Sequence, residues 1–198
     1  MRALLNNILD MNKHTSWKPL TPATWPDFEA LFGPRGACGG CWCMCWRMKA
    51  KDYEASHGQG TKAKMKALVD GGTEPGILAY ESGAPIGWCS VGPRTDFIRL
   101  ENSRILAPVD NKPVWSITCL VVEKAHRRQG VSRFLVAAAA EFAKSKGAAI
   151  LEAYPVIPKK DPMPDVFAWN GIYSTFKKLG FEIAAQRSDT HPVVRINL

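Results

Sequence analysis

The spacing of apolar residues along this chain switches between a helical and a strand-like period, and so predicts both kinds of element. A helix is expected to begin at Thr24, a capping residue, and to stop at Gly33, because the apolar residues between them fall at helical spacing. A second helix is expected over 61–69. From 71 to 93 the period falls to two, and the turn at 82–85 predicts a β-hairpin.

The second half of the chain is predicted to alternate strands and helices and to close with two strands. An apolar stripe at helical spacing runs over 131–146, whereas 148–156 is almost continuously apolar, as expected of a strand inside a parallel pair covered by helices. The strand at 114–122 should therefore lie parallel to 148–156, through a right-handed crossover. The other predicted segments are a polar loop at 94–112, a helix at 165–179 ended by Gly180, and strands at 181–186 and 193–198.

Length and composition indicate one globular domain, 1–198, with a substantial core. The chain has 198 residues, of which 46% are hydrophobic and 22% are charged. No apolar run approaches the ~20 residues that a membrane-spanning helix needs. Asn6, Asn7 and Asp10 stand where a signal peptide would need its apolar centre, within a segment that is otherwise helix-like. We therefore expect a cytoplasmic protein without membrane association.

A net charge of +8 attracts polyanions. The basic residues are scattered, and no single stripe alternates basic and aromatic side chains, so a nucleic-acid partner is not expected. A highly charged cofactor or an acidic acceptor explains the excess as well. A solvated basic surface without a partner explains much of it too.

Four of the six cysteines lie close together, at Cys38, Cys41, Cys43 and Cys45. A secreted disulfide scaffold would spread its cysteines, so this clustering favours a reducing compartment. Residues 41–46 alternate Cys with Trp or Met, and an extended segment would therefore have a thiol face and an apolar face.

Three interpretations of this cluster stay open. The first is a thiolate metal site formed by these four cysteines. Four thiols within eight positions are poorly spaced for one tetrahedral zinc ion, so we do not favour it and expect no metal site. Cys38 and Cys41 form a Cys-x-x-Cys pair that could sense redox state. The third interpretation, which we favour, is packing, with the thiols buried while Trp42, Met44 and Trp46 shape an acceptor pocket or its lid.

Residues 116–136 carry the strongest chemical signal in the chain. An apolar strand runs into a basic turn, and the turn opens at Gly130 into a helix. This geometry aims the unpaired N–H groups of a helix N-terminus at any anion in the turn. The stretch resembles the acyl-CoA-binding motif of the GCN5-related N-acetyltransferases (GNAT), Arg/Gln-x-x-Gly-x-Gly/Ala, which reads Arg127-x-x-Gly130-x-Ser132 here. Serine departs from the last position of the pattern, but it is small enough for a pyrophosphate to approach the backbone.

A plain strand-to-helix turn would also be basic and contain glycine, so the second motif matters. Residues 173–181, Tyr-Ser-Thr-Phe-Lys-Lys-Leu-Gly-Phe, resemble the GNAT segment Leu-Tyr-x-Lys-Leu-Gly-Phe. The two motifs occur in the family's order and at about its spacing. A Gly-Gly-Cys-Trp-Cys-Met segment like that at 39–44 also occurs in GNAT-like sequences, but it does not identify an acceptor.

The resemblance implies an α/β (α+β) GNAT fold, with a mixed central sheet, splayed parallel strands and helices on both faces. It covers the chain from about Gly76 to the C-terminus, which makes 76–198 the acyl-CoA-binding core and 1–75 the acceptor side. The implied co-substrate is acetyl-CoA, whose pantetheine amides can pair with backbone groups like an added strand. The implied cofactor-binding residues are Leu120, Val121 and Val122 for the pantetheine, and Gln129, Gly130, Val131 and Ser132 for the pyrophosphate, with Arg127 and Arg128 adding charge. The resemblance also implies cofactor contacts for Asn170, just before the second motif, and for Phe176 within it.

Two residues are candidates for proton transfer. In many relatives a tyrosine protonates the leaving thiolate, but this chain has Phe176 at that position, and Tyr173, one turn earlier, could substitute or simply pack. Glu152 stands alone in an apolar strand, where partial desolvation would suit a general base, although a buried ion pair is a close alternative.

The expected function is transfer of an acetyl group to a primary amine by direct attack in a ternary complex. The acceptor is a small-molecule or peptide amine that the sequence does not identify. The alternative is a non-catalytic acyl-CoA-binding protein or a thiol or metal sensor, suggested by Phe176 and the cysteines. Homodimers are common among relatives, but nothing in these residues shows one.

Overall fold

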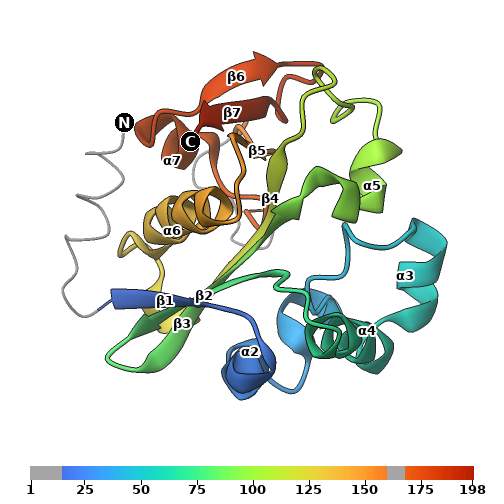
Figure 1. Cartoon of the computed structure of the whole chain (residues 1–198), viewed down its shortest axis with the longest axis vertical. Helices are drawn as coiled ribbons and strands as arrows, with labels where there is room; N and C mark the ends of the chain where they lie inside the picture. The colour runs from blue at the N-terminus through green and yellow to red at the C-terminus, as the bar shows by residue number, and fades with distance from the viewer. Residues whose placement is uncertain (1–14, 160–167) are drawn as a thin grey trace.

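A seven-stranded mixed sheet organises the molecule, in the order β1-β2-β3-β4-β5-β7-β6 (Figure 1). The computed structural model describes residues 15–159 and 168–198. Only β4 and β5 are parallel neighbours; the other pairs are antiparallel. The strands are β1 Thr15–Pro19, β2 Gly76–Glu81, β3 Ala84–Pro93, β4 Trp115–Val122, β5 Ile150–Ala153, β6 Glu182–Ala185 and β7 Val193–Asn197.

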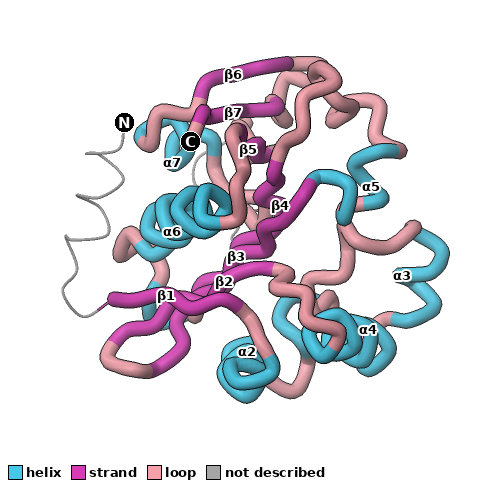
Figure 2. Tube along the Cα trace, in the orientation of Figure 1, coloured by secondary structure: helices cyan, strands magenta, loops and turns pink. Residues whose placement is uncertain are grey.

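Helices cover both faces of the sheet, which confirms the predicted fold class (Figure 2). Alternate residues of β2 separate the two layers: Ile77 and Ala79 pack in one core with the long helix α6, and Leu78 and Tyr80 pack in another with α2 and α4. The helices are α2 Trp25–Phe32, α3 Ala50–Ser56, α4 Gln59–Asp70, α5 Ile98–Glu101, α6 Val131–Ser145 and α7 Tyr173–Lys178. No helix in the described ranges is long and apolar enough to cross a membrane.

The predicted pair of parallel strands is present, but it is short. Pairing between β4 and β5 ends at Ile117 and Ala153, while β4 continues to Val122. The predicted strand 148–156 was thus too long, because its last residues leave the sheet and Val156 bridges Ile172 instead. The two central strands therefore separate toward their C-terminal ends.

Two other predictions need correction. The supposed loop 94–112 contains a 3₁₀ turn, Arg94–Asp96, followed by α5. The helix predicted at 165–179 begins only at Tyr173, because Gly171 has φ +81° and Ile172 is extended; residues 165–167 lie outside the described ranges. The prediction of a helix-like start at 1–10 also falls outside them.

The cysteine-rich segment 41–46 is a series of turns, not a strand. Met44 N–H bonds the Cys41 carbonyl and Arg47 N–H bonds the Met44 carbonyl, so the backbone folds back on itself. Trp42, Cys43 and Met44 are all buried in the α2–α4 core, at 2%, 5% and 5% exposure. The prediction of separate thiol and apolar faces was therefore wrong.

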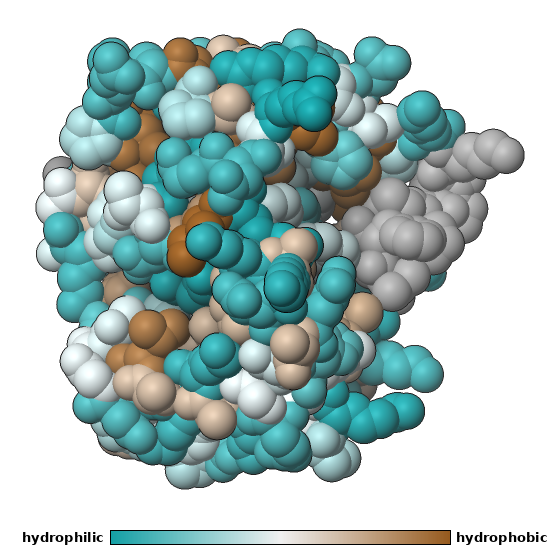
Figure 3. All heavy atoms as spheres, turned by 90° about the vertical axis from the view of Figure 1, so that its right-hand side faces the viewer, coloured by the Kyte–Doolittle hydropathy of each residue, from teal (hydrophilic) through white to brown (hydrophobic). Residues whose placement is uncertain are grey.

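The side of the molecule that carries α3 and α5 is mostly hydrophilic, and its apolar residues form small separate patches (Figure 3). A broad apolar docking area is not visible on this face. The residues with chemical interest lie instead around the edge where β4 and β5 separate.

Candidate active site

The turn between β4 and α6 has the geometry of an anion site. Gly130 has φ +87°, a left-handed conformation that glycine adopts at little cost, and it is the N-cap of the fifteen-residue helix α6. Gln129 and Gly130 are exposed, and Ser132 is half-buried, so the first N–H groups of the helix are accessible. A Cβ on Gly130 would come no closer than 3.7 Å to another atom, the Nη2 of Arg133. The turn thus offers an open, positively polarised helix end.

Local hydrogen bonds fix the shape of this turn. The Glu123 carboxylate accepts from Ala125 N–H at 2.7 Å and lies 2.7 Å from Nδ1 of His126, and these bonds hold the pKa of that carboxyl below its usual range. The Gln129 amide donates to the Ala125 carbonyl at 2.7 Å, and Arg127 Nε donates to the Val122 carbonyl at 3.2 Å. Hydrogen bonds between protein groups therefore hold the turn in this shape.

β4 continues beyond its last pair with β5, and the space where the two strands separate is called the opening. Backbone groups of β4 face this opening. Leu120 N–H donates to the Trp169 carbonyl at 2.7 Å, so it points away from β3. Because backbone groups alternate in direction along an antiparallel strand, Val122 faces the same way and Val121, opposite Trp88, faces β3. Of the three residues predicted to pair with the pantetheine, Leu120 and Val122 are the two whose backbone faces the opening.

Residues 168–172 run across this opening. Val156 N–H bonds the Gly171 carbonyl and Tyr173 N–H bonds the Val156 carbonyl, both at 2.9 Å, which ties the segment to the end of β5. Gly171 packs tightly, since a Cβ there would lie 2.6 Å from the Phe176 ring and 3.0 Å from Leu120.

Asn170 and the two aromatic residues of the second motif have different environments. Asn170 is 9% exposed, and its side-chain Oδ1 has no hydrogen-bond partner in the described structure. Phe176 is completely buried and meets Phe181 edge to face, at 5.2 Å between ring centroids. Tyr173 is half-buried against the α6 core at the start of α7.

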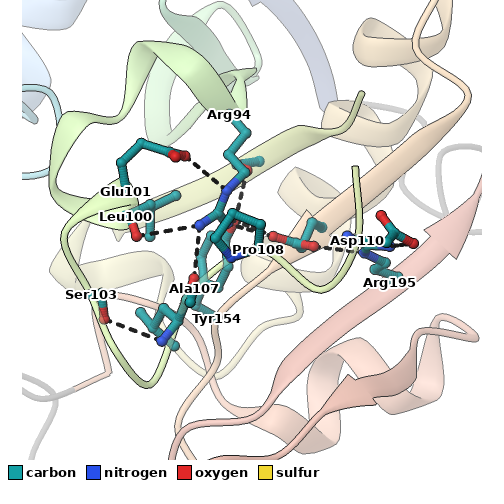
Figure 4. Close-up of polar contacts among 12 residues, drawn as sticks. Arg94, Leu100, Glu101, Ser103, Ala107, Pro108, Asp110, Tyr154 and Arg195 are labelled. Carbon is teal, nitrogen blue, oxygen red and sulfur yellow. Dashed lines mark hydrogen bonds and ion pairs between the residues drawn. The ribbon is translucent and has the colours of Figure 1, made fainter. Parts of the chain in front are cut away.

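Glu152 is completely buried and is held from both sides by arginines, Arg94 and Arg195, which are labelled in Figure 4. Arg94 Nη1 donates to Oε1 at 2.8 Å, and Arg195 Nε donates to Oε2 at 2.6 Å. The Tyr154 hydroxyl also donates to Oε1 at 2.5 Å, and burial raises the pKa of that hydroxyl well above its ordinary value. Because both carboxylate oxygens are bound to protein donors, the geometry favours the structural alternative for Glu152 over the general base.

The same network reaches the edge of the sheet. Arg94 also donates to the Leu106 carbonyl at 2.8 Å and to Glu101, while Arg195 donates to Asp110 at 2.8 Å. We call Arg94, Ser116, Glu152, Tyr154 and Arg195 the charge network, since Ser116 lies 2.8 Å from the Tyr154 hydroxyl. These partners of Glu152 were not predicted from the sequence. A signal was present at Tyr154, which falls on the same face of the strand two residues later.

Farther along the same face of β4, the face opposite α6, thiols replace charges. Cys43 Sγ lies 3.3 Å from Cys119 Sγ, and the Trp88 indole donates to Cys43 at 2.8 Å. Cys41 is half-buried beside them, and Cys38 is exposed. Within the described residues no group of three or more His, Cys, Asp or Glu side chains has the arrangement of a metal site.

The acceptor side meets the β4 opening through aromatic contacts. The Trp46 and Trp169 rings lie 5.8 Å apart, and the Trp46 Nε1 is buried without a hydrogen-bond partner among the described residues. A separate cavity of about 560 Å³ lies between α2 and the start of α4, lined by Arg35, Trp42, His57 and neighbouring residues. Trp42 thus borders a cavity, whereas Trp46 borders the opening.

Comparison with solved structures shows which known proteins share this arrangement. A GNAT-family acetyltransferase from Listeria monocytogenes 4b F2365 superposes with a TM-score of 0.57 at 8% identity, covering 93% of this chain and 95% of that one. The PaiA N-acetyltransferase from Thermoplasma acidophilum, solved with coenzyme A, gives 0.51 at 9% identity, covering 93% and 99%. Ard1 from Thermoplasma volcanium gives 0.51 at 12% identity, covering 93% and 98%. At such identities the likeness concerns the fold.

Sequence comparison identifies the family. No protein of curated function matches the chain in sequence. Residues 42–161, more than half of the 198, match the model of the acetyltransferase (GNAT) family. The chain therefore belongs to the GNAT family of N-acetyltransferases, enzymes that take their acetyl group from acetyl-CoA.

Proposed function

We propose that this protein transfers the acetyl group of acetyl-CoA to a primary amine of a small molecule or peptide, by direct attack within a ternary complex. The observation that carries the proposal is the unit formed by β4, the turn at Gly130 and α6, in which the open helix end adjoins the separated edge of β4. A diphosphate and an amide-containing arm need these two features side by side.

The residues of the turn fit a diphosphate. Gly130 leaves its backbone accessible, and the N–H groups of Val131 and Ser132 belong to the first turn of α6, where no carbonyl of the helix can bond them. Arg128 is exposed at the same turn. We assign pyrophosphate binding to Gln129, Gly130, Val131 and Ser132, with Arg127 and Arg128 contributing positive charge.

The edge of β4 and Asn170 fit the amide-containing arm. Leu120 and Val122 face the opening, where their backbone groups can pair with amides of the pantetheine. The bond from Leu120 N–H to the Trp169 carbonyl has to be replaced in this pairing, and one amide hydrogen bond exchanges for another at little net cost. The unpaired Oδ1 of Asn170 supports a ligand contact, because a buried amide oxygen is seldom left without a donor.

Catalysis then depends on orientation and on stabilising the developing oxyanion. The N–H groups of β4 that face the opening are those of Leu120 and Val122, and the one that is not paired with a pantetheine amide is our candidate for polarising the thioester carbonyl. Tyr173 is our candidate for protonating the leaving thiolate, because it begins α7 directly beside Val156 and keeps a half-exposed side chain. Phe176 has no proton to give and is buried beneath Gly171, so we assign it to packing under the cofactor segment.

Glu152 stays in the proposal as a positioning residue. Its contacts with Arg94 and Arg195 join the ends of β3, β5 and β7 next to the point where β4 and β5 separate. A carboxylate bound to two guanidinium groups is a weak base, since each cation favours its charged form. Its role as general base is a separate prediction that a variant can test.

The acceptor amine is expected to enter from the side of residues 41–47. Trp46 contacts Trp169 at the opening, and Cys43 contacts Cys119 one residue before Leu120, so this segment forms the wall facing β4. Aromatic faces can hold an ammonium or an apolar chain equally well. The wall is compatible with small-molecule and peptide amines alike.

Calorimetry with acetyl-CoA tests the binding part of the proposal. Gly130→Glu places a carboxylate in the turn where the pyrophosphate is expected, and we expect at least a tenfold loss of affinity, about 1.4 kcal/mol. Gly147→Glu is the matched control, because Gly147 ends the same helix with φ +85° and has no atom within 4 Å of an added Cβ. Equal affinities for both variants and the wild type would reject the proposed site.

An acceptor panel tests the catalytic part. We expect release of coenzyme A, followed by mass spectrometry of the product, with one class of primary amines. Binding of acetyl-CoA without turnover on amines, amino acids, polyamines and peptides would instead support a non-catalytic acyl-CoA-binding protein.

A further inference from the structure

Three cysteines from two distant segments meet where residues 41–47, which we call the acceptor wall, contact β4. Cys43 and Cys119 are 76 positions apart in sequence, yet their sulfur atoms lie 3.3 Å apart and both residues are buried. Cys41 lies beside Cys43, is half-buried, and contacts the Gly36 carbonyl at 3.8 Å. We call Cys41, Cys43 and Cys119 the thiol cluster. The remaining cysteines differ: Cys38 is exposed, Cys45 is bound by Arg99, and Cys89 packs in the α6 core.

The backbone around the thiol cluster is strained. Ala37, Trp42 and Cys43 have φ values of +59°, +40° and +52°, a region that residues with a Cβ adopt at a cost of about 1–3 kcal/mol each. Stacking of Trp42 on Phe32, at 5.5 Å and 19°, helps to hold this conformation. Strain of this kind gathers at functional positions, and here it places the Cys43 sulfur against β4.

Two of the three sulfur atoms, those of Cys41 and Cys43, differ in acidity, which gives them different chemical roles. A hydrogen bond from the Cys43 thiol lowers the pKa of Cys41 to about 7, against the effect of burial. Burial and the neighbouring thiols raise the pKa of Cys43 well above its ordinary value. Because Cys43 has a single proton to donate, it bonds either the Cys41 sulfur or the Cys119 sulfur at one time. The bond to Cys41 forms when Cys41 is ionised.

We propose that the thiol cluster is an oxidation site for hydroperoxides, in which Cys41 reacts first and Cys43 and Cys119 end as a reversible disulfide. The first step joins the Cys41 sulfur to the terminal oxygen of the peroxide, breaks the O–O bond and releases an alcohol or water, leaving a sulfenic acid. The Cys43 sulfur then attacks the Cys41 sulfur, and its proton leaves with the hydroxide as water. A Cys41–Cys43 disulfide results.

Thiol–disulfide exchange completes the sequence. The Cys119 sulfur attacks Cys43, and Cys41 leaves as a thiolate, which the Cys119 proton neutralises. Attack at Cys43 is favoured because, of the two sulfur atoms in the Cys41–Cys43 disulfide, that of Cys41 has the lower pKa and is the better leaving group. In total, two thiols and one hydroperoxide give one disulfide, one alcohol or water, and one further water. The Cys43 and Cys119 sulfur atoms need to approach by only about 1 Å to reach bonding distance.

This disulfide would connect the acceptor wall to the strand that binds the acyl group. Cys119 directly precedes Leu120, whose N–H faces the opening, and the segment of Cys43 carries Trp46 against Trp169. Oxidation is therefore expected to alter acetyl transfer, a consequence that rests on the proposed function. The disulfide itself does not rest on it.

Peptide mapping after mild hydrogen peroxide treatment tests the proposal on the full chain. We expect a Cys43–Cys119 crosslink between the two peptides and loss of two titratable thiols, both reversed by dithiothreitol. Oxidation that gives no crosslink between these peptides, or a disulfide that uses Cys38, would overturn it.

Three variants separate the steps. Cys41→Ser should slow formation of the crosslink at least tenfold, and Cys119→Ala should let dimedone trap a sulfenic acid on Cys41 or leave a Cys41–Cys43 disulfide. Cys38→Ser is the matched control, because it removes a thiol of the same segment outside the cluster and should leave the rate unchanged. Crosslinking at the wild-type rate in Cys41→Ser would refute the role of Cys41, and circular dichroism verifies that each variant is folded.

Activity provides a separate readout. A crosslink that forms without any change in acetyl-CoA binding would remove the regulatory consequence and leave the oxidation site in place. Failure to bind acetyl-CoA in the reduced protein would instead reject the proposed function alone.

Discussion

Two buried polar clusters lie along β4, and different kinds of interaction hold them together. The charge network reaches the strand at Ser116, and the thiol cluster reaches it at Cys119, three residues later. In the charge network both oxygens of Glu152 accept hydrogen bonds from arginines. In the thiol cluster the sulfur atoms contact each other, and the backbone at Cys43 is in a left-handed conformation.

This difference separates stability from reactivity. A buried charge that is fully paired resists change, because removal of one partner leaves the other unpaired in the protein interior. A thiol such as Cys41, whose pKa is lowered to about 7, can react without breaking any ion pair. We therefore expect changes in the charge network to alter folding stability, and changes around the thiol cluster and the opening to alter chemistry.

The largest effect is expected at Glu152. Glu152→Gln keeps the shape of the side chain but leaves Arg94 and Arg195 without a buried counter-charge. We expect the free energy of unfolding to fall by about 3–5 kcal/mol, measured by urea denaturation.

Glu101→Gln is the control for Glu152. Glu101 also pairs with Arg94, but its side chain is 48% exposed, so a change below about 1 kcal/mol is expected. Wild-type stability of Glu152→Gln together with a collapse of kcat and loss of the acid limb of the pH–rate profile would show a general base instead.

Regular elements could be predicted from the sequence because their periods are local. The hairpin of β2 and β3, the strand β4 and the helix α6 follow directly from apolar spacing and from glycine at each helix end. The turn at Gly130 between β4 and α6 could also be predicted, because strand, turn and helix are contiguous in the sequence.

The partners of Glu152 and the shape of the cysteine segment could not be predicted in this way. Arg94 and Arg195 lie 58 and 43 positions from Glu152, and no local period reveals a contact at such separation. At Trp42 and Cys43, alternation of Cys with Trp favoured a strand, but tertiary packing of Trp42 against Phe32 imposes positive φ. Packing over long sequence distance prevailed over local preference in both cases.

An intermediate effect is expected at Asn170, which lies at the opening. Its buried Oδ1 has no partner in the described structure, so Asn170→Ala removes an unsatisfied group at little cost in stability, within about 1 kcal/mol. If that oxygen contacts the co-substrate, affinity for acetyl-CoA should fall about tenfold, which corresponds to about 1.4 kcal/mol. Thermal denaturation and calorimetry measure the two quantities.

Ser116→Ala is the matched control for Asn170. It also removes a buried polar group, but one that is already paired, with the Tyr154 hydroxyl at 2.8 Å. We expect a stability loss of about 1 kcal/mol and unchanged affinity for acetyl-CoA. Lower affinity for acetyl-CoA in Ser116→Ala, with unchanged affinity in Asn170→Ala, would instead place the ligand contact on the charge network and contradict the comparison.

The smallest effect is a difference in pH dependence at Cys41, without any change in fold. A thiol reacts as its thiolate, and an ordinary exposed cysteine ionises near pH ~8.5. Because the pKa of Cys41 is lowered to about 7, its alkylation by iodoacetamide should accelerate as pH rises through 7 and then level off. Mass spectrometry of the Cys41 peptide over about pH 5–9, two units on either side of that value, measures this profile.

Cys43→Ala tests the cause of that shift. The variant removes the hydrogen bond that stabilises the Cys41 thiolate, so the midpoint of alkylation should move to higher pH. Cys45 and Tyr53 also lie near Cys41 and remain in place in this variant. Burial raises the pKa of both groups, so both are uncharged near pH 7 and neither accounts for the lowered pKa of Cys41. A midpoint that stays near 7 in Cys43→Ala would assign the acidity of Cys41 to backbone N–H groups of its own turn, and the thiol cluster would then lack the coupling that sets it apart from the charge network.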